Sequence, residues 1–437
     1  MSVTSTEKNI NVAVIGMLEQ NPEIKGDPLR AEALEVLRTL GLPSQKNEEF
    51  KYTPLTRELE KNFSTSAYHT LPLPSDLGTL RLPSLDSSNI VFVNGKYRSD
   101  LSSPPRQAAV TVISLKDALK NKAFASEHFA KIAEFKNNAF AAWNTAGWND
   151  GLFVHVPENT ELEKPLFLHY INDGSGPDLI ELNRNLIVCG KNSKATIIEK
   201  FDTLAANFHF INLVNEIVVE QNADLNLYSI QNDRSLKAHH SQYTYTHIYQ
   251  SNFSRVNTYT FTLNGKLIRN NLHLSLDGEG IESHMYGLYL LSNDTLADNH
   301  TVVDHKKPNS YSNELYKGIM DGNSKGVFNG KVYVRPNAQK TNAFQANRNI
   351  LLTDKAGVNT KPQLEIWADD VKCSHGCTIG QLDEEALFYL RTRGINKDTA
   401  QAMMLYAFAG EVIESVKHPV IKEYLDAIIG ERLHKSF

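Results

Sequence analysis

Cysteine is scarce in this chain, with only 3 residues of this type among 437, Cys189, Cys373 and Cys377. So few thiols cannot form the disulfide framework of a small secreted protein, and a chain of this length can bury a large apolar core without one. The amino terminus lacks the basic start and apolar stretch of a secretory signal peptide. We therefore expect a protein of the reducing cytoplasm.

Long apolar runs and a dominant charge are also lacking. No uninterrupted apolar stretch approaches the roughly 20 residues that a membrane-spanning helix needs. The 50 acidic residues nearly balance the 45 basic ones, which gives a formal net charge of −5. A charge this small produces no broad attraction to nucleic acid or to an anionic membrane. We expect neither of them as a partner.

The motifs of several common enzyme classes are missing. Gly330-Lys331 is followed by Val332, where a phosphate-binding loop requires Ser or Thr. The chain contains neither the Gly-x-Ser-x-Gly turn of α/β-hydrolases nor the His-Glu-x-x-His pair of zinc peptidases. These absences weaken the case for an enzyme without excluding one.

What the sequence does contain divides it into three regions. Residues 1–150 form a region of helices and loops, in which Asp27 can cap a helix that Gly41 ends. Residues 151–380 consist of one short strand after another. Residues 381–437 are helical again. This order predicts a mainly β core with a helical region at each end.

The central region consists of short β-branched or alternating runs such as 152–156, 186–188 and 216–219. Turn pairs such as Asn264-Gly265 and Asn329-Gly330 separate many of them. No helix long enough for a crossover connection interrupts the region, which disfavours a doubly wound α/β sheet. An antiparallel sandwich or barrel and a β-helix both fit. The absence of a strict repeat period leaves the two open.

The carboxyl-terminal region shows helical spacing of apolar residues, with a helix after Asp383, a longer one after Asn396 and a last one after Pro419. Small and flexible side chains gather on the longer helix, which suits a docking surface for a partner. These candidate partner-binding residues are Ala400, Met403, Met404, Ala407 and Phe408. A helical cap that covers the β core explains the same spacing.

One segment concentrates metal-binding side chains, because Cys373, His375 and Cys377 lie within five residues. Thiolates and imidazole are ligands for iron and zinc. In a β-strand these alternate residues would point to the same face. The cysteine spacing matches neither a Cys-x-x-Cys redox pair nor half of a zinc knuckle, and small buried core residues would also explain the cysteines.

Several segments between about residues 325 and 430 have distinctive sequences, namely 330–334, 338–343, 349–352, 361–366, 369–378 and 383–395. A further one upstream is Glu48-Glu49-Phe50-Lys51-Tyr52-Thr53-Pro54-Leu55. The first group specifically resembles the SufB/SufD family of iron–sulfur cluster assembly proteins, and the upstream segment resembles it more weakly. Lys372-Cys373-Ser374-His375-Gly376 is similar to the SufD side of the family, whereas SufB carries a glutamate after the histidine. Cys377 stands where SufD relatives more often have alanine.

The resemblance implies a right-handed parallel β-helix between helical regions. It also implies a non-catalytic scaffold in a cytoplasmic complex with a homologous SufB-type subunit and a SufC-type ABC ATPase, which would dock on the carboxyl-terminal helices. His375, and less strongly Cys373, would take part in holding a nascent iron–sulfur cluster shared transiently with SufB. The chain alone would hold no stable cofactor, and a homodimer is conceivable in isolation. The alternatives are a β-helical enzyme and a stand-alone metal-binding protein.

Overall fold

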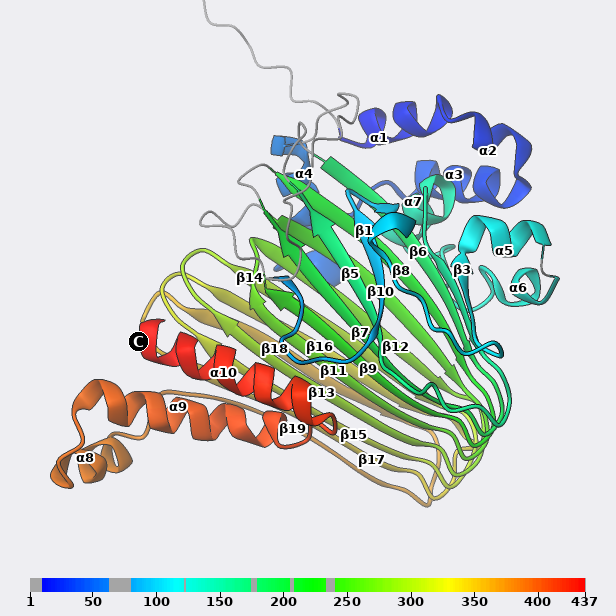
Figure 1. The fold of residues 1–437 in the computed structure, drawn as a ribbon. Coiled ribbons are helices and arrows are strands. Elements are labelled where there is room, and N and C mark those ends of the chain that lie inside the picture. The colour runs from blue at the N-terminus through cyan, green and yellow to red at the C-terminus, as the bar shows by residue number, and fades with distance from the viewer. Residues whose placement is uncertain are drawn as a thin grey trace, which may run out of the picture.

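The computed structural model describes residues 10–62, 80–121, 123–173, 179–204, 208–232 and 240–436. Its centre consists of two long sheets, and from β4 onward successive strands of the chain alternate between them (Figure 1). From β4 onward, strands that neighbour each other in a sheet are parallel. Each turn of the chain therefore adds one strand to each sheet, which makes the core a parallel β-helix. The mainly β fold is confirmed, and the antiparallel sandwich is not formed.

Sheet A contains the odd-numbered strands of the β-helix and two early strands of the chain. In spatial order it runs from β19 to β5 and then to β1 and β2. Its strands are β1 (Ser88–Val93), β2 (Lys96–Tyr97), β5 (Leu166–Asn172), β7 (Lys194–Thr203), β9 (Asp224–Asn232), β11 (Arg255–Asn264), β13 (Glu282–Leu291), β15 (Tyr311–Met320), β17 (Asn342–Leu351) and β19 (Lys372–Gly380).

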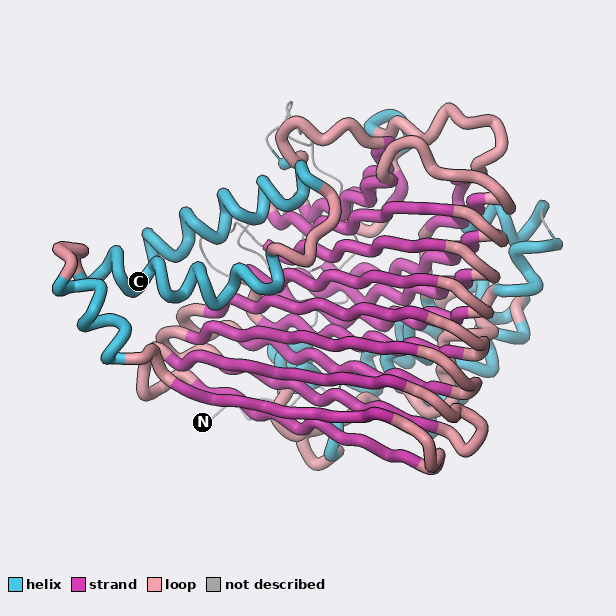
Figure 2. Tube along the Cα trace, turned by 90° about the horizontal axis from the view of Figure 1, so that it is seen from below, coloured by secondary structure: helices cyan, strands magenta, loops and turns pink. Residues whose placement is uncertain are grey.

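Sheet B contains the even-numbered strands from β4 onward and begins with β3, which pairs antiparallel with β4. Figure 2 shows the strands of the two sheets as stacked layers joined by short loops. The strands of sheet B are β3 (Thr111–Ser114), β4 (Leu152–Val156), β6 (Leu179–Cys189), β8 (His209–Val219), β10 (His240–Gln250), β12 (Leu267–Leu276), β14 (Leu296–His305), β16 (Lys325–Val334) and β18 (Gly357–Ile366).

The length of one turn varies along the β-helix, which explains why the sequence shows no strict period. Ser241 pairs with Leu267, 26 residues later, whereas Phe153 pairs with Leu186, 33 residues later. Asn264-Gly265 lies at a turn as predicted, but Asn329-Gly330 lies inside β16. Gly330 is needed there because a Cβ atom would approach Gln345 Nε2 to 2.3 Å.

The space between the two sheets holds the main apolar core. Alternate residues of each strand point inward, so that Ile197 and Phe201 of sheet A meet Leu213 and Ile217 of sheet B in one cluster. Rings also stack from turn to turn, with centroids 5.0 Å apart for Tyr170 and Phe201. The opposite faces of the sheets are covered by the two helical regions.

The amino-terminal helices cover the outer face of sheet B at its early strands. Phe140 and Trp143 pack there against Phe210 and Tyr243. The predicted cap at Asp27 is confirmed, since its side chain accepts hydrogen bonds from the first turn of α3. The elements are α1 (Ile10–Glu19), α2 (Pro22–Gly26), α3 (Pro28–Leu40), η1 (Glu48–Phe50), α4 (Leu55–Asn62), η3 (Ser99–Leu101), α5 (Leu115–Asn121), α6 (Ala123–His128) and α7 (Ala139–Gly147).

The carboxyl-terminal helices are α8 (Glu384–Thr392), α9 (Lys397–Ile413) and α10 (Pro419–Ser436). Both α9 and α10 lie along the outer face of sheet A, whereas α8 projects away from the β-helix (Figure 1). No helix among the described residues is long and apolar enough to cross a membrane.

Candidate functional site

The β-helix ends in an open turn. β19 is the last strand of sheet A and pairs only with β17, and β18 is the last strand of sheet B. Eight of the nine residues of β19 are exposed. An uncovered edge strand presents its backbone N–H and C=O groups to solvent, which makes it a template for pairing with another chain.

The predicted metal-binding residues lie in this last turn. Cys373, His375 and Cys377 are aligned with Ala343, Gln345 and Asn347 of β17. The three residues share one face of the strand, as the sequence predicted, and Ala343 and Cys373 show that this face is directed toward the core of the β-helix. The side chains of His375 and Cys377 remain exposed because no further turn covers them.

The three thiols differ in their surroundings. Cys189 is fully buried among apolar side chains, and burial raises the pKa of its thiol to about 12. Cys373 is half-buried, and burial raises its pKa as well. Both shifts disfavour the thiolate that binds metals. Cys377 is the exposed thiol of the set.

These residues alone do not make a complete metal centre. Among the described residues, no group of three or more His, Cys, Asp and Glu side chains is arranged to hold a metal ion. His375 and Cys373 are thus placed on one surface without being joined into one site. Exposed apolar side chains flank them at the same end of the β-helix, namely Ile366, Trp367 and Ile379.

The candidate docking residues of α9 divide between two sides of the helix. Ala400 is fully buried, and Phe408 is half-buried, with Lys317 Nζ lying 4.5 Å from the centre of its ring. Met404 is half-buried as well, whereas Ala407 and Met403 are exposed, Met403 by 48%. Only part of the predicted set is therefore accessible to a partner in this conformation.

Helix α8 carries exposed aromatic residues that pattern reasoning did not select as a site. Phe388 is 68% exposed and Tyr389 57%, and no residue of α8 is buried. Tyr406 of α9 adds a third exposed ring in this carboxyl-terminal region. The signal was present in the sequence, because Phe388-Tyr389 belongs to the closing segment that carries the family resemblance.

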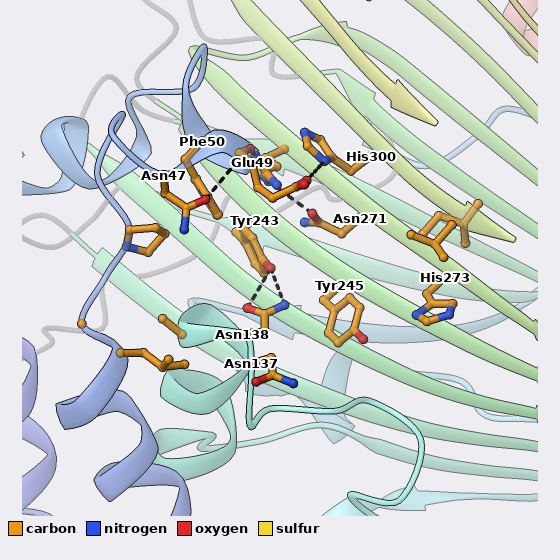
Figure 3. A pocket seen from close by; sticks show the side chains of 17 residues that line it. Asn47, Glu49, Phe50, Asn137, Asn138, Tyr243, Tyr245, Asn271, His273 and His300 are labelled. Carbon is orange, nitrogen blue, oxygen red and sulfur yellow. Dashed lines mark hydrogen bonds and ion pairs between the residues drawn. The ribbon is translucent and has the colours of Figure 1, made fainter. Parts of the chain in front are cut away.

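A second polar site lies on the outer face of sheet B. There the η1 segment reaches over the sheet, and Glu49 meets His300 of β14 at 3.2 Å (Figure 3). Glu49 also meets Lys331 of β16 at 2.7 Å. The hydrogen bond from His300 is the main reason why the pKa of Glu49 lies far below its ordinary value. Arg269 donates to the Glu49 carbonyl and stacks on Phe50.

These contacts form a clasp, by which we mean Glu49, Phe50, Arg269, Asp298 and His300. Asp298 is fully buried, and although burial alone would raise its pKa, His300 and Arg269 lower it. A cavity of about 340 Å³ lies beside the clasp, lined also by Asn138 and Tyr243 (Figure 3). The polar groups of the clasp bind one another, and these contacts hold the amino-terminal region on the β-helix.

The comparison with known proteins agrees with this geometry over nearly the whole chain. Residues 17–168 match the family described as the SufBD protein N-terminal region. Residues 170–408 match the one described as SUF system FeS cluster assembly, SufBD core domain. The second match alone spans more than half of the chain.

Individual relatives point the same way. The iron-sulfur cluster assembly protein SufD of Escherichia coli is 32% identical over 413 residues, which cover 94% of this chain and 93% of the relative. The SufBD family protein slr0076 of Synechocystis is 32% identical over 396 residues, covering 89% and 86%. SufD of Bacillus subtilis is 25% identical and covers 93% of both chains.

The β-helix with helices at both ends, together with these matches, places the chain among the iron–sulfur cluster assembly proteins of the SUF system. It belongs to the SufBD family, and within that family it is SufD-like. The resemblance expected from the sequence is thereby confirmed.

Proposed function

We propose that this chain is the non-catalytic SufD-type scaffold subunit of a SufBCD-type complex in the cytoplasm. The single observation that carries the proposal is the position of His375 on the open last turn of the β-helix. His375 lies on an uncovered sheet edge, and a second β-helix would add its own strands at that edge. One imidazole supplies only one ligand, and iron–sulfur clusters usually take four. The other ligands would come from the homologous SufB-type subunit.

The edge of β19 has the properties of such an interface. Backbone pairing along an edge strand provides affinity, and apolar side chains beside it add buried area. Ile379 and Trp367 are 50% and 48% exposed in the chain alone. Leaving this apolar surface in contact with water costs free energy. When the chain is isolated from its partners, two copies that pair through the same edge would form a homodimer.

The nascent cluster is the cargo of the complex in this proposal. His375 would donate one lone pair to it, and Cys373, whose raised pKa disfavours the thiolate, would contribute less. The cluster would be shared transiently across the interface and then passed on. The chain itself would hold no stable cofactor.

The SufC-type ABC ATPase would dock on the carboxyl-terminal helices. The accessible candidates are Met403 and Ala407 of α9, to which the exposed rings of Phe388, Tyr389 and Tyr406 add area. Ala400 and Phe408 would act from behind by holding α9 on sheet A. The exposed set is rich in aromatic residues and Met, which are enriched in protein interfaces.

Copurification of a tagged chain with its two partners tests the proposal. We expect Ile379→Glu to lose the homologous subunit while it keeps the ATPase, because it places a charge in the edge interface only. Met403→Glu should do the reverse, so each variant controls for the other. If both variants retain both partners, or if the unmodified chain brings down neither, the proposal is wrong.

A further inference from the structure

Below His375, one turn further into the β-helix, lies a buried amide. Gln345 of β17 is the residue directly aligned with His375, and both lie on the inward face of their strands. Aligned residues of neighbouring strands are about 4.8 Å apart, which brings their side chains within mutual reach. Gln345 is 3% exposed, and the missing side chain of Gly330 gives its amide room.

A buried carboxylate fixes how this amide is oriented. Glu314 of β15 is aligned with Gln345 in turn, and Gln345 Nε2 donates a 2.7 Å hydrogen bond to Glu314 Oε2. At pH 8, above the pKa of about 7 to which burial raises Glu314, the carboxylate is ionised and only accepts hydrogen bonds, so it holds the NH₂ group of the amide toward itself. Gln345 Oε1 then has no hydrogen-bond donor among the described residues.

A buried carbonyl oxygen without a donor is costly, and most such groups in proteins have a partner. The imidazole directly above it has a ring N–H to give. Histidines that bind metals usually donate their second ring nitrogen to an oxygen acceptor, which fixes the tautomer and leaves the other lone pair for the metal.

We propose that Gln345, held in place by Glu314, is a positioning residue for His375. Its Oε1 accepts the ring N–H of His375, and the other ring nitrogen presents its lone pair outward to the nascent cluster. This inference rests on the proposed role of His375 as a ligand. Glu314 and Gln345 touch neither partner nor cargo, and act only through the imidazole.

The interior of the β-helix contains a matched control. Asn215 Nδ2 donates to Glu199 Oε1 over 2.9 Å, in a second buried pair of an amide and a carboxyl. Burial raises the pKa of Glu199 and that of Glu314 alike, to about 7. Of these two carboxyl groups, only Glu314 is connected, through Gln345, to the open last turn. A substitution that acts merely by altering a buried carboxyl would therefore have the same effect at Glu314 and at Glu199.

The experiment combines two readouts. The tautomer of His375 is measured in the isolated chain at pH 8, above the ordinary pKa of imidazole, by ¹⁵N NMR with labelled histidine, and His375→Ala identifies the signal. Iron and sulfide are then measured in the reconstituted complex. The variants are Gln345→Leu, Glu314→Gln and, as the control, Glu199→Gln.

We expect one dominant tautomer in the unmodified chain and a mixture of both in Gln345→Leu. The cluster content of that variant should fall about 10-fold, as is usual when the partner of a ligating histidine is removed. Glu314→Gln should lie in between, because an amide can replace the acceptor but no longer enforces the orientation. Glu199→Gln should change neither readout.

The outcomes separate this inference from the proposed function. If His375→Ala lowers cluster content while Gln345→Leu leaves tautomer and cluster unchanged, the positioning role is wrong and the ligand role stands. If Gln345→Leu mixes the tautomers but His375→Ala leaves cluster content unchanged, the ligand role is wrong. Should both interior variants fail to fold, comparable amounts of the two tautomers in the unmodified chain would overturn the inference.

Discussion

Among the residues that the structure describes, two carboxyl groups in the interior of the β-helix have no cationic partner among their hydrogen bonds. Glu199 accepts from Asn215 and Glu314 accepts from Gln345. Burial is the largest influence on both, and it raises their pKa from the ordinary 4.5 to about 7. Each carboxyl therefore gains or loses its proton near neutral pH in the folded chain, but near pH 4.5 in the unfolded chain.

This difference predicts a pH-dependent stability. Because the folded state binds the proton more tightly, the contribution of Glu199 is fully present below pH 4.5 and is lost as the pH rises through about 7. The loss amounts to about 3 kcal/mol for one group. Glu199→Gln, which imitates the protonated form, should reduce the fall in the free energy of unfolding between pH 5 and pH 8.

Urea unfolding at the two pH values measures this effect. Glu158→Gln is the control, because Glu158 is exposed and its replacement should leave the pH dependence as it is. An unchanged fall in Glu199→Gln would show that the buried carboxyl is ionised at both pH values.

The cysteines allow a second prediction at this scale. Cys377 is exposed, so Cys377→Ala should change unfolding free energy by less than about 0.5 kcal/mol and leave cluster content unchanged. Cys189→Ser should instead cost about 1–3 kcal/mol, because it buries a hydroxyl in an apolar core. Loss of cluster in Cys377→Ala would mean that the extra thiol takes part in assembly.

Single residues were predictable where the rule is local. That Cys373, His375 and Cys377 share a face follows from the alternation of a strand, and the structure confirms it. The pairing of Gln345 with Glu314 joins residues 31 positions apart and depends on the register between two strands. No local pattern contains that register.

At the scale of elements, the carboxyl-terminal helices illustrate what an amphipathic pattern cannot decide. The spacing on α9 fits both a docking surface and a cap, and the structure shows one side of the helix buried and the other exposed. Leu405 and Ala409 pack on sheet A with Phe261 and Leu315, while Met403 faces solvent. α10 joins the same apolar layer.

This packing predicts the result of a truncation. A chain that ends at Arg393 would expose the outer face of sheet A, where Tyr228, Phe261, Leu288 and Ile319 are buried under α9 and α10. We expect it to aggregate, because exposed apolar patches of this kind associate. Light scattering and the soluble fraction after expression measure the effect. A soluble, folded, monomeric product would show that the helices do not cap the core.

The β-helix itself was left open by the pattern for a physical reason. Its turns range from 26 to 33 residues, so the repeat has no fixed period. A weaker signal lay in the corners, where Asn159, Asn192 and Asn222 all take a left-handed conformation with φ of 57°. Their side chains form a hydrogen-bonded ladder from turn to turn, at 2.8 and 3.1 Å. Asparagine tolerates this conformation better than most residues.

At the scale of the whole molecule, the two ends of the β-helix differ. The first turn is joined by β1, β2 and β3, and the amino-terminal helices cover the early strands of sheet B. The clasp, which connects η1 to β12 and β14, extends this cover along sheet B, and the ion pair of Glu49 with Lys331 adds a contact to β16. In the last turn β19 is exposed, whereas β18 is mostly half-buried. One closed end and one open end suit a subunit that pairs through a single edge.

The central claim of this account is that the open end contributes His375 to a cluster shared with a homologous subunit. The most direct measurement is the iron and acid-labile sulfide content of the reconstituted complex, compared between the unmodified chain and His375→Ala at equal partner stoichiometry. We predict that His375→Ala retains both partners, since the side chain is exposed, while cluster content falls severalfold or more. Unchanged iron and sulfide in an intact His375→Ala complex would contradict the claim.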